Sequence, residues 1–131
     1  MNGTPIRVLI VDDEPSICKA FQLCLERNGY EALTAQTCDA MSAILIAKRV
    51  DVLLMDMRIG MDRGDWVFET AKGFQPHLAR STAFMTGDIT SKADELLGQY
   101  NCPLLRKPFD LKDLINVVRE LSPHRAQDAS A

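Results

Sequence analysis

The chain has 131 residues, a formal net charge of −3, 47% hydrophobic residues and 25% charged residues. These values are typical of one soluble globular domain with its own core. They exclude the strongly basic surface of a nucleic-acid-binding domain, and no apolar run reaches the roughly 18 residues of a membrane span. Because the N-terminus also lacks the pattern of a signal peptide, we expect a cytoplasmic protein that contacts no membrane.

The cysteines give no sign of a metal site or a disulfide framework. They are Cys18, Cys24, Cys38 and Cys102, and they form neither a C-x-x-C pair nor the spacing of a zinc site. We therefore expect free thiols that pack as small apolar side chains in a reducing compartment.

The first half of the chain alternates short apolar runs with helical patterns. Strands are predicted over residues 6–11, 30–35 and 50–56, and the last has the almost continuous apolar run of a central parallel strand. After the first strand, Pro15 suits the first turn of a helix that ends near residues 28–29. Apolar residues recur with helical spacing in two segments, first Ile17, Ala20, Phe21, Cys24 and Leu25, and then Met41, Ile44 and Leu45.

The second half continues the alternation. The predicted elements are a loop over residues 57–64, a helix around Val67, Ala71 and Phe74, a strand over 80–87, a helix around 93–100, and a short strand over 102–105. A fifth helix follows, with Asp110 as its candidate N-cap and Leu121 as its last inward residue. Residues 122–131 have the composition of a tail or the start of a linker.

Five strands and five helices in strict alternation predict an α/β domain with a parallel sheet. Right-handed crossovers place helices on both faces of such a sheet. We expect this domain to span residues 6–121. In open sheets of this kind, ligands bind beyond the carboxyl ends of the strands, so the residues just after each strand are the candidates for a site.

Those positions hold Asp12 and Asp13, then Asp56, Thr86 and Lys107. Each pair of carboxylates about 4 Å apart costs about 4 kcal/mol at an effective dielectric constant of about 20. The cluster must therefore hold a proton or a cation, and a few carboxylates suit Mg²⁺. A hydroxyl and an ammonium group suit a phosphoryl oxygen. Taken singly, each residue could be a helix cap or a solvated surface group; their joint arrangement favours a site.

Four motifs carry a resemblance to a known family. They are "VDD" at residues 11–13, "LLMDMR" around Asp56, "MTG" at 85–87 and "RKPF" at 106–109, each at the end of a predicted strand. In this order they resemble the receiver domain of two-component response regulators over about residues 6–121. The resemblance implies a doubly wound, flavodoxin-like sheet with strand order 2-1-3-4-5 and five helices on its two faces.

The resemblance also implies the chemistry of the acidic residues. Asp56 matches the aspartate that accepts the phosphoryl group. Asp13 matches the residue that binds Mg²⁺ directly, and Asp12 matches its neighbour, which often acts through a water. Asp56 also matches a ligand of the metal ion, and the backbone carbonyl of Arg58 matches a further one.

Thr86 and Lys107 match the hydroxyl and the lysine that contact the phosphoryl group, and the Lys107–Pro108 bond is cis in this family. The implied partner is a sensor histidine kinase or a phosphotransfer protein. The domain would catalyse only its own phosphorylation and dephosphorylation, so we do not class it as an enzyme. An output domain or output partner would lie outside this chain. Family partners use the first helix and the face formed by the fourth helix, fifth strand and fifth helix.

The sequence departs from the family pattern near the predicted site. Leu104 occupies the position of an aromatic residue that rotates in many receivers, so we expect a smaller or different output change. Gly60 replaces a usual proline, and with Gly64 it predicts a more permissive loop. Trp66 is expected to pack near the rim of the site.

Two other functions remain as alternatives. A pseudo-receiver would act as a protein-interaction module without phosphate, although the complete acidic set argues against it. A phosphohydrolase of the haloacid dehalogenase type also uses an aspartate nucleophile and Mg²⁺, but it requires a second aspartate where this chain has Arg58. A P-loop enzyme is disfavoured because no G-x-x-x-x-G-K-[ST] motif follows the first strand.

Overall fold

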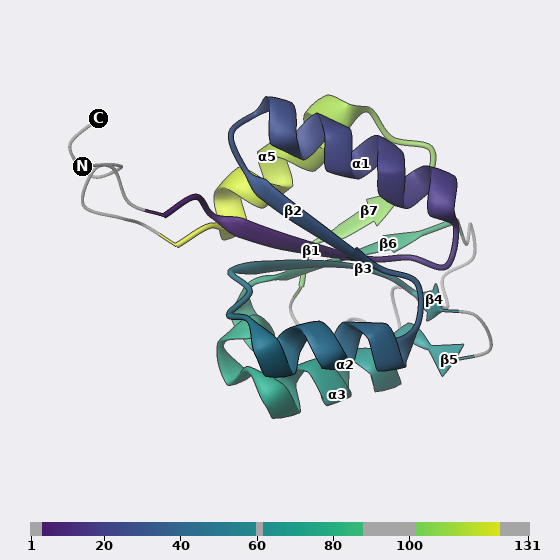
Figure 1. Ribbon diagram of the computed structural model, residues 1–131. Helices are drawn as coiled ribbons and strands as arrows, with labels where there is room; N and C mark the ends of the chain where they lie inside the picture. Colours follow the sequence, from purple (N-terminus) through teal and green to yellow (C-terminus); the bar gives the residue numbers. More distant parts are fainter. Residues whose placement is uncertain (1–3, 60–61, 88–101, 124–131) are drawn as a thin grey trace.

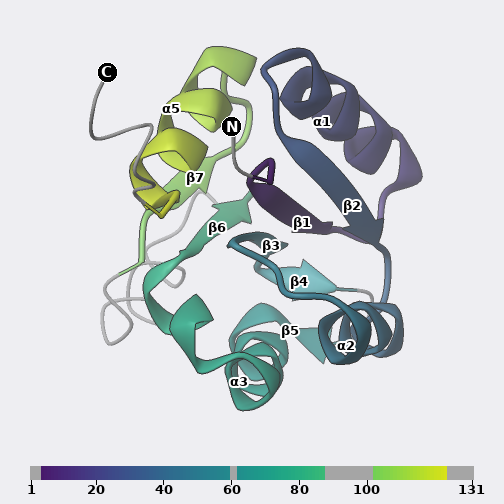
Figure 2. The ribbon, with the colours of Figure 1, turned by 60° about the vertical axis from the view of Figure 1, so that its left-hand side comes forward.

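The computed structural model of the protein describes residues 4–59, 62–87 and 102–123. Its sheet contains five parallel strands in the order β2-β1-β3-β6-β7. They are β1 (Arg7–Val11), β2 (Glu31–Ala35), β3 (Val52–Asp56), β6 (Thr82–Thr86) and β7 (Leu104–Arg106). Figure 2 shows β7 beside β6 on one side of the sheet and β2 beside β1 on the other. The predicted order 2-1-3-4-5 is confirmed.

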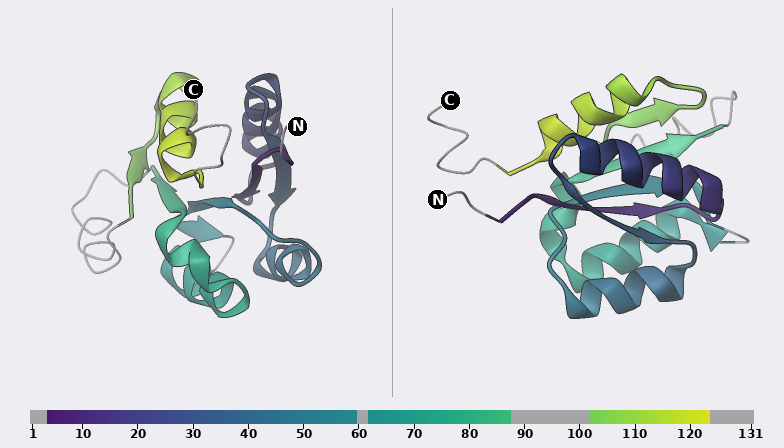
Figure 3. Two further views of the ribbon diagram at one scale, coloured as in Figure 1. Left: turned by 90° about the vertical axis from the view of Figure 1, so that its left-hand side faces the viewer. Right: turned by 45° about the horizontal axis from the view of Figure 1, so that its top comes forward.

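Helices cover both faces of this sheet (Figures 1 and 3). Helices α1 (Pro15–Arg27) and α5 (Leu111–Leu121) lie on one face, and α2 (Cys38–Ala47) and α3 (Gly64–Phe74) lie on the other. Successive strand residues point to opposite faces, so Val8 and Ile10 pack under α1 and α5 while Leu9 and Val11 pack under α2 and α3. Within the described residues, no helix combines the length and apolar character needed to cross a bilayer.

Two predicted elements differ from those described in the structure. The helix expected around residues 93–100 lies outside the described residues. The strand expected over 80–87 is shorter, because residues Pro76–Arg80 form the 3₁₀ helix η1 and β6 begins only at Thr82. The hydroxyl of Thr82 donates a hydrogen bond to the Leu78 carbonyl at 2.7 Å, which closes this turn against the strand.

The loop predicted after β3 contains additional strand structure. Strands β4 (Arg58–Ile59) and β5 (Asp62–Arg63) pair in antiparallel fashion, and Ile59 is buried in the core beneath α2 and α3. Two-residue strands carry no measurable periodicity, so the sequence pattern could not predict them. This pair lies between the end of β3 and the start of α3.

The structure also bears on three local predictions: the cis peptide bond, the N-cap of α5 and the free cysteines. The Lys107–Pro108 bond is cis, as the resemblance implied. Asp110 is the N-cap residue of α5, but its side chain makes no capping hydrogen bond; its carbonyl accepts the Asp113 N–H at 2.9 Å instead. All four cysteines lie in the described part of the chain and form no disulfide, and Cys18 is buried whereas the other three are half-buried.

Candidate functional site

The parallel topology brings the predicted site residues to one edge of the sheet. Asp12 follows β1, Asp56 ends β3, Thr86 ends β6, and Lys107 follows β7. One carboxylate oxygen from each of Asp12, Asp13 and Asp56 lies within 4.8 Å of the other two. Thr86 is buried, with an exposed fraction of 3%. The structure therefore brings the carboxyl ends of four strands to one edge of the sheet, where the three aspartates meet.

Lys107 is the cation of this cluster. Its Nζ atom donates a hydrogen bond to Asp56 Oδ2 at 2.9 Å and another to Asp12 Oδ2 at 3.3 Å. Its backbone N–H donates to the Thr86 carbonyl at 2.7 Å, which ties it to the end of β6. Burial alone would lower the pKa of Lys107, but the hydrogen bonds and charges of Asp56 and Asp12 outweigh this effect and raise it. The ammonium group is therefore charged at neutral pH.

Asp12 is completely buried, and its environment opposes its charge. Burial raises the pKa of Asp12, and the nearby Asp56 carboxylate acts in the same direction. The Glu14 N–H, which donates to Asp12 Oδ1 at 3.0 Å, and the Lys107 ammonium act against this rise. Asp12 is thus held in position by the backbone while its charge is only partly compensated.

The donor set fits a hard divalent cation. Three carboxylates and one ammonium group leave a formal charge of −2 when all are ionised, and the clustered atoms are all oxygens. Mg²⁺ prefers such oxygen ligands and commonly binds through one or two carboxylates and several waters. Arg58 lies in β4, two residues after Asp56, and the participation of its backbone carbonyl remains a prediction.

Gly64 has a role that the sequence did not predict. A Cβ atom at this position would lie 2.6 Å from the backbone oxygens of both Asp56 and Met57. Gly64 also donates its backbone N–H to the Met57 carbonyl. The glycine therefore allows the start of α3 to approach the backbone of the phosphoacceptor candidate. The permissive loop stays a prediction, because Gly60, its other glycine, lies outside the described residues.

The comparison with known families agrees with this geometry. The family model of the response regulator receiver domain matches residues 8–119. The chain belongs to this family. The match spans the receiver motifs noted in the sequence and all the clustered site residues.

Curated relatives of this receiver domain are transcriptional regulatory proteins. PdtaR of Mycobacterium tuberculosis is 29% identical over 132 residues, which cover 98% of this chain and 62% of the relative. TrcR of the same species is 28% identical, with coverage of 92% and 46%. AlgB of Pseudomonas aeruginosa is 40% identical over 58 residues, with coverage of 44% and 13%. The receiver domain thus spans less than two thirds of the length of each.

Solved structures share the fold. A CheY-like receiver domain protein from Methanospirillum hungatei aligns with a TM-score of 0.80 and 24% identity, covering 89% of this chain and 93% of that one. The chemotaxis protein CheY4 of Vibrio cholerae aligns with a TM-score of 0.80 and 22% identity, covering 90% and 99%. A Burkholderia pseudomallei response regulator, with a phosphorylated aspartic acid and a calcium ion, has a TM-score of 0.76 and 19% identity, covering 95% and 69%.

Leu104 occupies the position where many receiver domains carry an aromatic ring. It pairs with Phe84 across β6 and β7, and its half-buried side chain packs against the core beneath α2 and α3. Phe84 in turn makes an edge-on contact with Phe68, with ring centroids 5.1 Å apart. An aliphatic side chain therefore takes the place of the usual ring, and the effect on the output remains a prediction.

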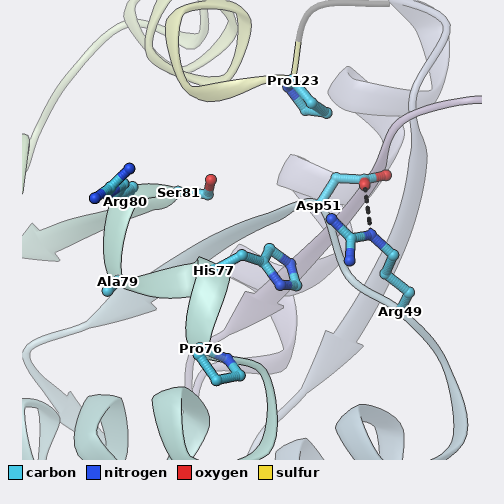
Figure 4. Close-up of a pocket in the computed structure, with 8 residues that line it drawn as sticks. All are labelled: Arg49, Asp51, Pro76, His77, Ala79, Arg80, Ser81 and Pro123. Carbon is cyan, nitrogen blue, oxygen red and sulfur yellow. Dashed lines mark ion pairs between the residues drawn. The ribbon is translucent and has the colours of Figure 1, made fainter.

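A pocket lies at the opposite edge of the sheet (Figure 4). It has a volume of about 580 Å³ and is lined by Arg49, Asp51, Pro76, His77, Ala79, Arg80, Ser81 and Pro123. Asp51 and Ser81 precede β3 and β6, whereas Asp56 and Thr86 end these strands. His77 points its ring Nε2 at the Val50 carbonyl, 2.6 Å away, so it serves the local structure. This pocket is separate from the acidic cluster.

Proposed function

We propose that Asp56 accepts a phosphoryl group from the phosphohistidine of a sensor histidine kinase or a phosphotransfer protein. The observation that carries this proposal is the contact between the Lys107 ammonium and the Asp56 carboxylate, at 2.9 Å, within a cluster of three aspartates. The lysine provides a positive charge beside the Asp56 carboxylate, where phosphoryl oxygens would lie.

In the proposed step, a carboxylate oxygen of Asp56 forms a bond to phosphorus as the phosphorus–nitrogen bond of the phosphohistidine breaks. The electron pair of the broken bond stays on the imidazole nitrogen, and the product is an acyl phosphate. A carboxylate is a weak nucleophile, so positioning and charge stabilisation supply most of the rate enhancement.

The chain's own groups would act on the incoming oxygens. Lys107 would exchange its bond with Asp56 for one with the phosphoryl group, and the Thr86 hydroxyl would donate a hydrogen bond to the same group. Asp12, Asp13 and Asp56, with the Arg58 carbonyl, would hold Mg²⁺. When bound, the metal ion supplies positive charge that offsets the charge of the aspartates and of the phosphoryl oxygens.

We propose that the acyl phosphate controls protein interactions on α1 and on the face that includes β7 and α5. The Burkholderia regulator of the same fold, with its phosphorylated aspartic acid and calcium ion, is consistent with this chemistry. Because the matched relatives are longer transcriptional regulators, an output domain or output partner outside this chain would read the change. The domain would act catalytically only on its own phosphorylation and dephosphorylation.

The test is the intact mass of the protein after incubation with phosphoramidate, a small phosphodonor, and Mg²⁺. We expect the gain of one phosphoryl group in the wild type and none in Asp56→Asn. We also expect EDTA to suppress the gain. Asp113→Asn, which changes an exposed aspartate in the first turn of α5, is the matched control and should gain the group normally.

A gain that persists in Asp56→Asn would assign the phosphoryl group to another residue. No gain from phosphoramidate or from any phosphorylated histidine protein would overturn the proposal and favour the pseudo-receiver alternative.

A further inference from the structure

Trp66 is the most exposed aromatic side chain among the described residues. Its exposed fraction is 64%, although it lies in the first turn of α3, beside the inward-facing Val67. The expectation that this side chain is packed was therefore wrong, because most of it is exposed. An exposed tryptophan contributes little to a core, but tryptophan is enriched among the residues that dominate protein–protein binding energies.

Arg63 is fixed beside this ring. Its Nε and Nη2 atoms donate hydrogen bonds to the two carboxylate oxygens of Asp65, at 3.0 and 2.7 Å. Asp65 is buried, with an exposed fraction of 5%, so the anchor of the guanidinium is rigid. The guanidinium carbon lies 5.3 Å from the centroid of the Trp66 ring, within the range of a cation–π contact. We call Arg63 and Trp66 the rim pair.

The rim pair belongs to the edge of the domain that carries Asp56. Arg63 ends β5, and the next residue, Gly64, contacts the backbone of Asp56 and Met57. Figure 1 shows β4 and β5 at the same end of the domain as the start of α1, which follows Asp12 and Asp13. The rim pair therefore lies on the surface that surrounds the acidic cluster.

We propose that the rim pair contacts the protein phosphodonor and helps to determine which donor transfers its phosphoryl group to Asp56. This inference rests on the proposed function. The donor's phosphorus must come within about 3–3.5 Å of an Asp56 oxygen, so a folded donor domain must cover the surrounding edge. A residue exposed on that edge therefore becomes part of the interface.

The chemistry of the rim pair defines the complementary donor surface. A guanidinium has five N–H groups, and Asp65 accepts from two of them, which leaves three for an acceptor on the donor. The Asp65 carboxylate offsets the charge of Arg63, so a carbonyl or a carboxylate next to an apolar patch is the best complement. Since the guanidinium is already oriented, binding loses less side-chain entropy than with a mobile arginine.

The experiment compares two classes of phosphodonor on the same set of proteins. Phosphoramidate reports the chemistry at Asp56 without a protein interface. The protein donors are the purified histidine kinases and phosphotransfer proteins of the source organism, phosphorylated with radiolabelled ATP, and the fastest donor for the wild type is used. The variants are Trp66→Ala, Arg63→Ala and Trp66→Phe. The control is Phe74→Ala, which removes an aromatic ring, 43% exposed, from the other end of α3.

We expect Trp66→Ala and Arg63→Ala to accept the phosphoryl group from the protein donor at least tenfold more slowly than the wild type. Trp66→Phe should fall between Trp66→Ala and the wild type, and Phe74→Ala should match the wild type. All four variants should react with phosphoramidate at the wild-type rate. Thermal melting should be unchanged in Trp66→Ala, Trp66→Phe and Phe74→Ala, whereas Arg63→Ala, which leaves the buried Asp65 carboxylate without this partner, should melt at a lower temperature. This pattern separates recognition of the donor from the chemistry and from the fold.

Equal rates from the protein donor for the wild type and the rim-pair variants would overturn the inference and leave the chemistry of Asp56 intact. Slower reaction with both donor classes would also overturn it, because the rim pair would then act on the site itself. Failure of the wild type with phosphoramidate and with every protein donor would instead reject the proposed function, and the inference with it.

Discussion

Lys107 and Asp56 are 51 residues apart in the chain, yet the Lys107 Nζ atom lies 2.9 Å from Asp56 Oδ2. The same ammonium group also reaches Asp12, so one cation serves two aspartates of a cluster of three. Among the contacts of the described residues, three carboxylates thus share one ammonium group. We therefore expect the stability of the domain to depend on divalent cations.

The first prediction concerns Asp12→Asn. Burial raises the pKa of Asp12, which means that the native structure favours an uncharged side chain there. In EDTA, we expect the variant to have a higher free energy of unfolding than the wild type, because a neutral amide places no charge in this buried position. Excess Mg²⁺ should stabilise the wild type much more than the variant.

Urea unfolding with EDTA or with Mg²⁺ measures both effects. Asp113→Asn, the exposed control, should respond to Mg²⁺ as the wild type does. Equal stabilisation of wild type and Asp12→Asn by Mg²⁺ would contradict a metal site at this cluster.

The second prediction compares two glycines of α3. In Gly64→Ala, the new methyl group would collide with the backbone oxygens of Asp56 and Met57, so we expect a loss of about 1–3 kcal/mol in the free energy of unfolding. Phosphorylation of Asp56 should also slow, because its backbone must move. A Cβ atom added at Gly73 would meet nothing within 4 Å, so Gly73→Ala should stabilise the helix by about 0.5–1 kcal/mol.

Chemical unfolding and phosphoramidate kinetics on the two variants test this contrast. If Gly64→Ala is as stable and as reactive as Gly73→Ala, the close approach at the start of α3 is not required.

The third prediction concerns Gln75, which lies between α3 and η1 and caps the end of α2 with its side chain. Its Nε2 donates to the carbonyls of Leu45 and Lys48 at 2.9 and 2.7 Å, and its Oε1 accepts the Val50 N–H at 2.9 Å. Gln75→Ala leaves these three backbone groups without that partner. We therefore expect the free energy of unfolding to fall by about 1–3 kcal/mol.

Gln22→Ala is the matched control for this change. The Gln22 side chain donates one hydrogen bond, to the Ala32 carbonyl at 3.1 Å. Loss of this bond should lower the free energy of unfolding by about 0.5–1.5 kcal/mol. Unfolding in urea ranks the two variants, and a larger loss for Gln22→Ala would show that Gln75 does not hold α2 in place.

The fourth prediction is a pH dependence that arises from Arg7 and Glu31. The hydrogen bond from Arg7 Nε to Glu31 Oε2, at 2.7 Å, lowers the pKa of Glu31 below its ordinary value of 4.5. Since the folded pKa lies below the unfolded one, the pair contributes stability above pH 4.5, and this contribution disappears as the pH falls through the folded pKa.

Glu31→Gln lacks this titration. The melting temperature of the wild type should exceed that of the variant at pH 6, and the difference should narrow as the pH falls to about 3. Thermal melts across this range measure the difference, and a constant difference would show that the ion pair does not contribute in this way.

Much of the fold and the site follows from the sequence because the informative patterns are long or repeated. The apolar run of β3 predicts a central parallel strand, and parallel strands must end at a common edge. That rule alone brings Asp12, Asp56, Thr86 and Lys107 together. The family motifs then identify Asp56 as the candidate for phosphorylation.

The features that could not be predicted depend on contacts through space. The close approach at Gly64 is one of them, because a sequence does not reveal which backbone atoms lie beside a glycine. Trp66 was expected to pack. The positions of Val67 and Ala71, however, define the inward side of α3 and place Trp66 outside it. The pairing of Arg63 with Asp65 also escaped notice, since opposite charges two residues apart rarely meet on a helix.

The two ends of the described chain meet far from the acidic cluster. The Arg7 N–H at the start of β1 donates to Asp51 at 2.8 Å, and Asp51 shares the opposite pocket with Pro123, which follows α5. The start of β1 and the residue after α5 therefore lie at one end of the strands, and the acidic cluster lies at the other. Any segment joined to the domain through these two places would begin on the side away from Asp56.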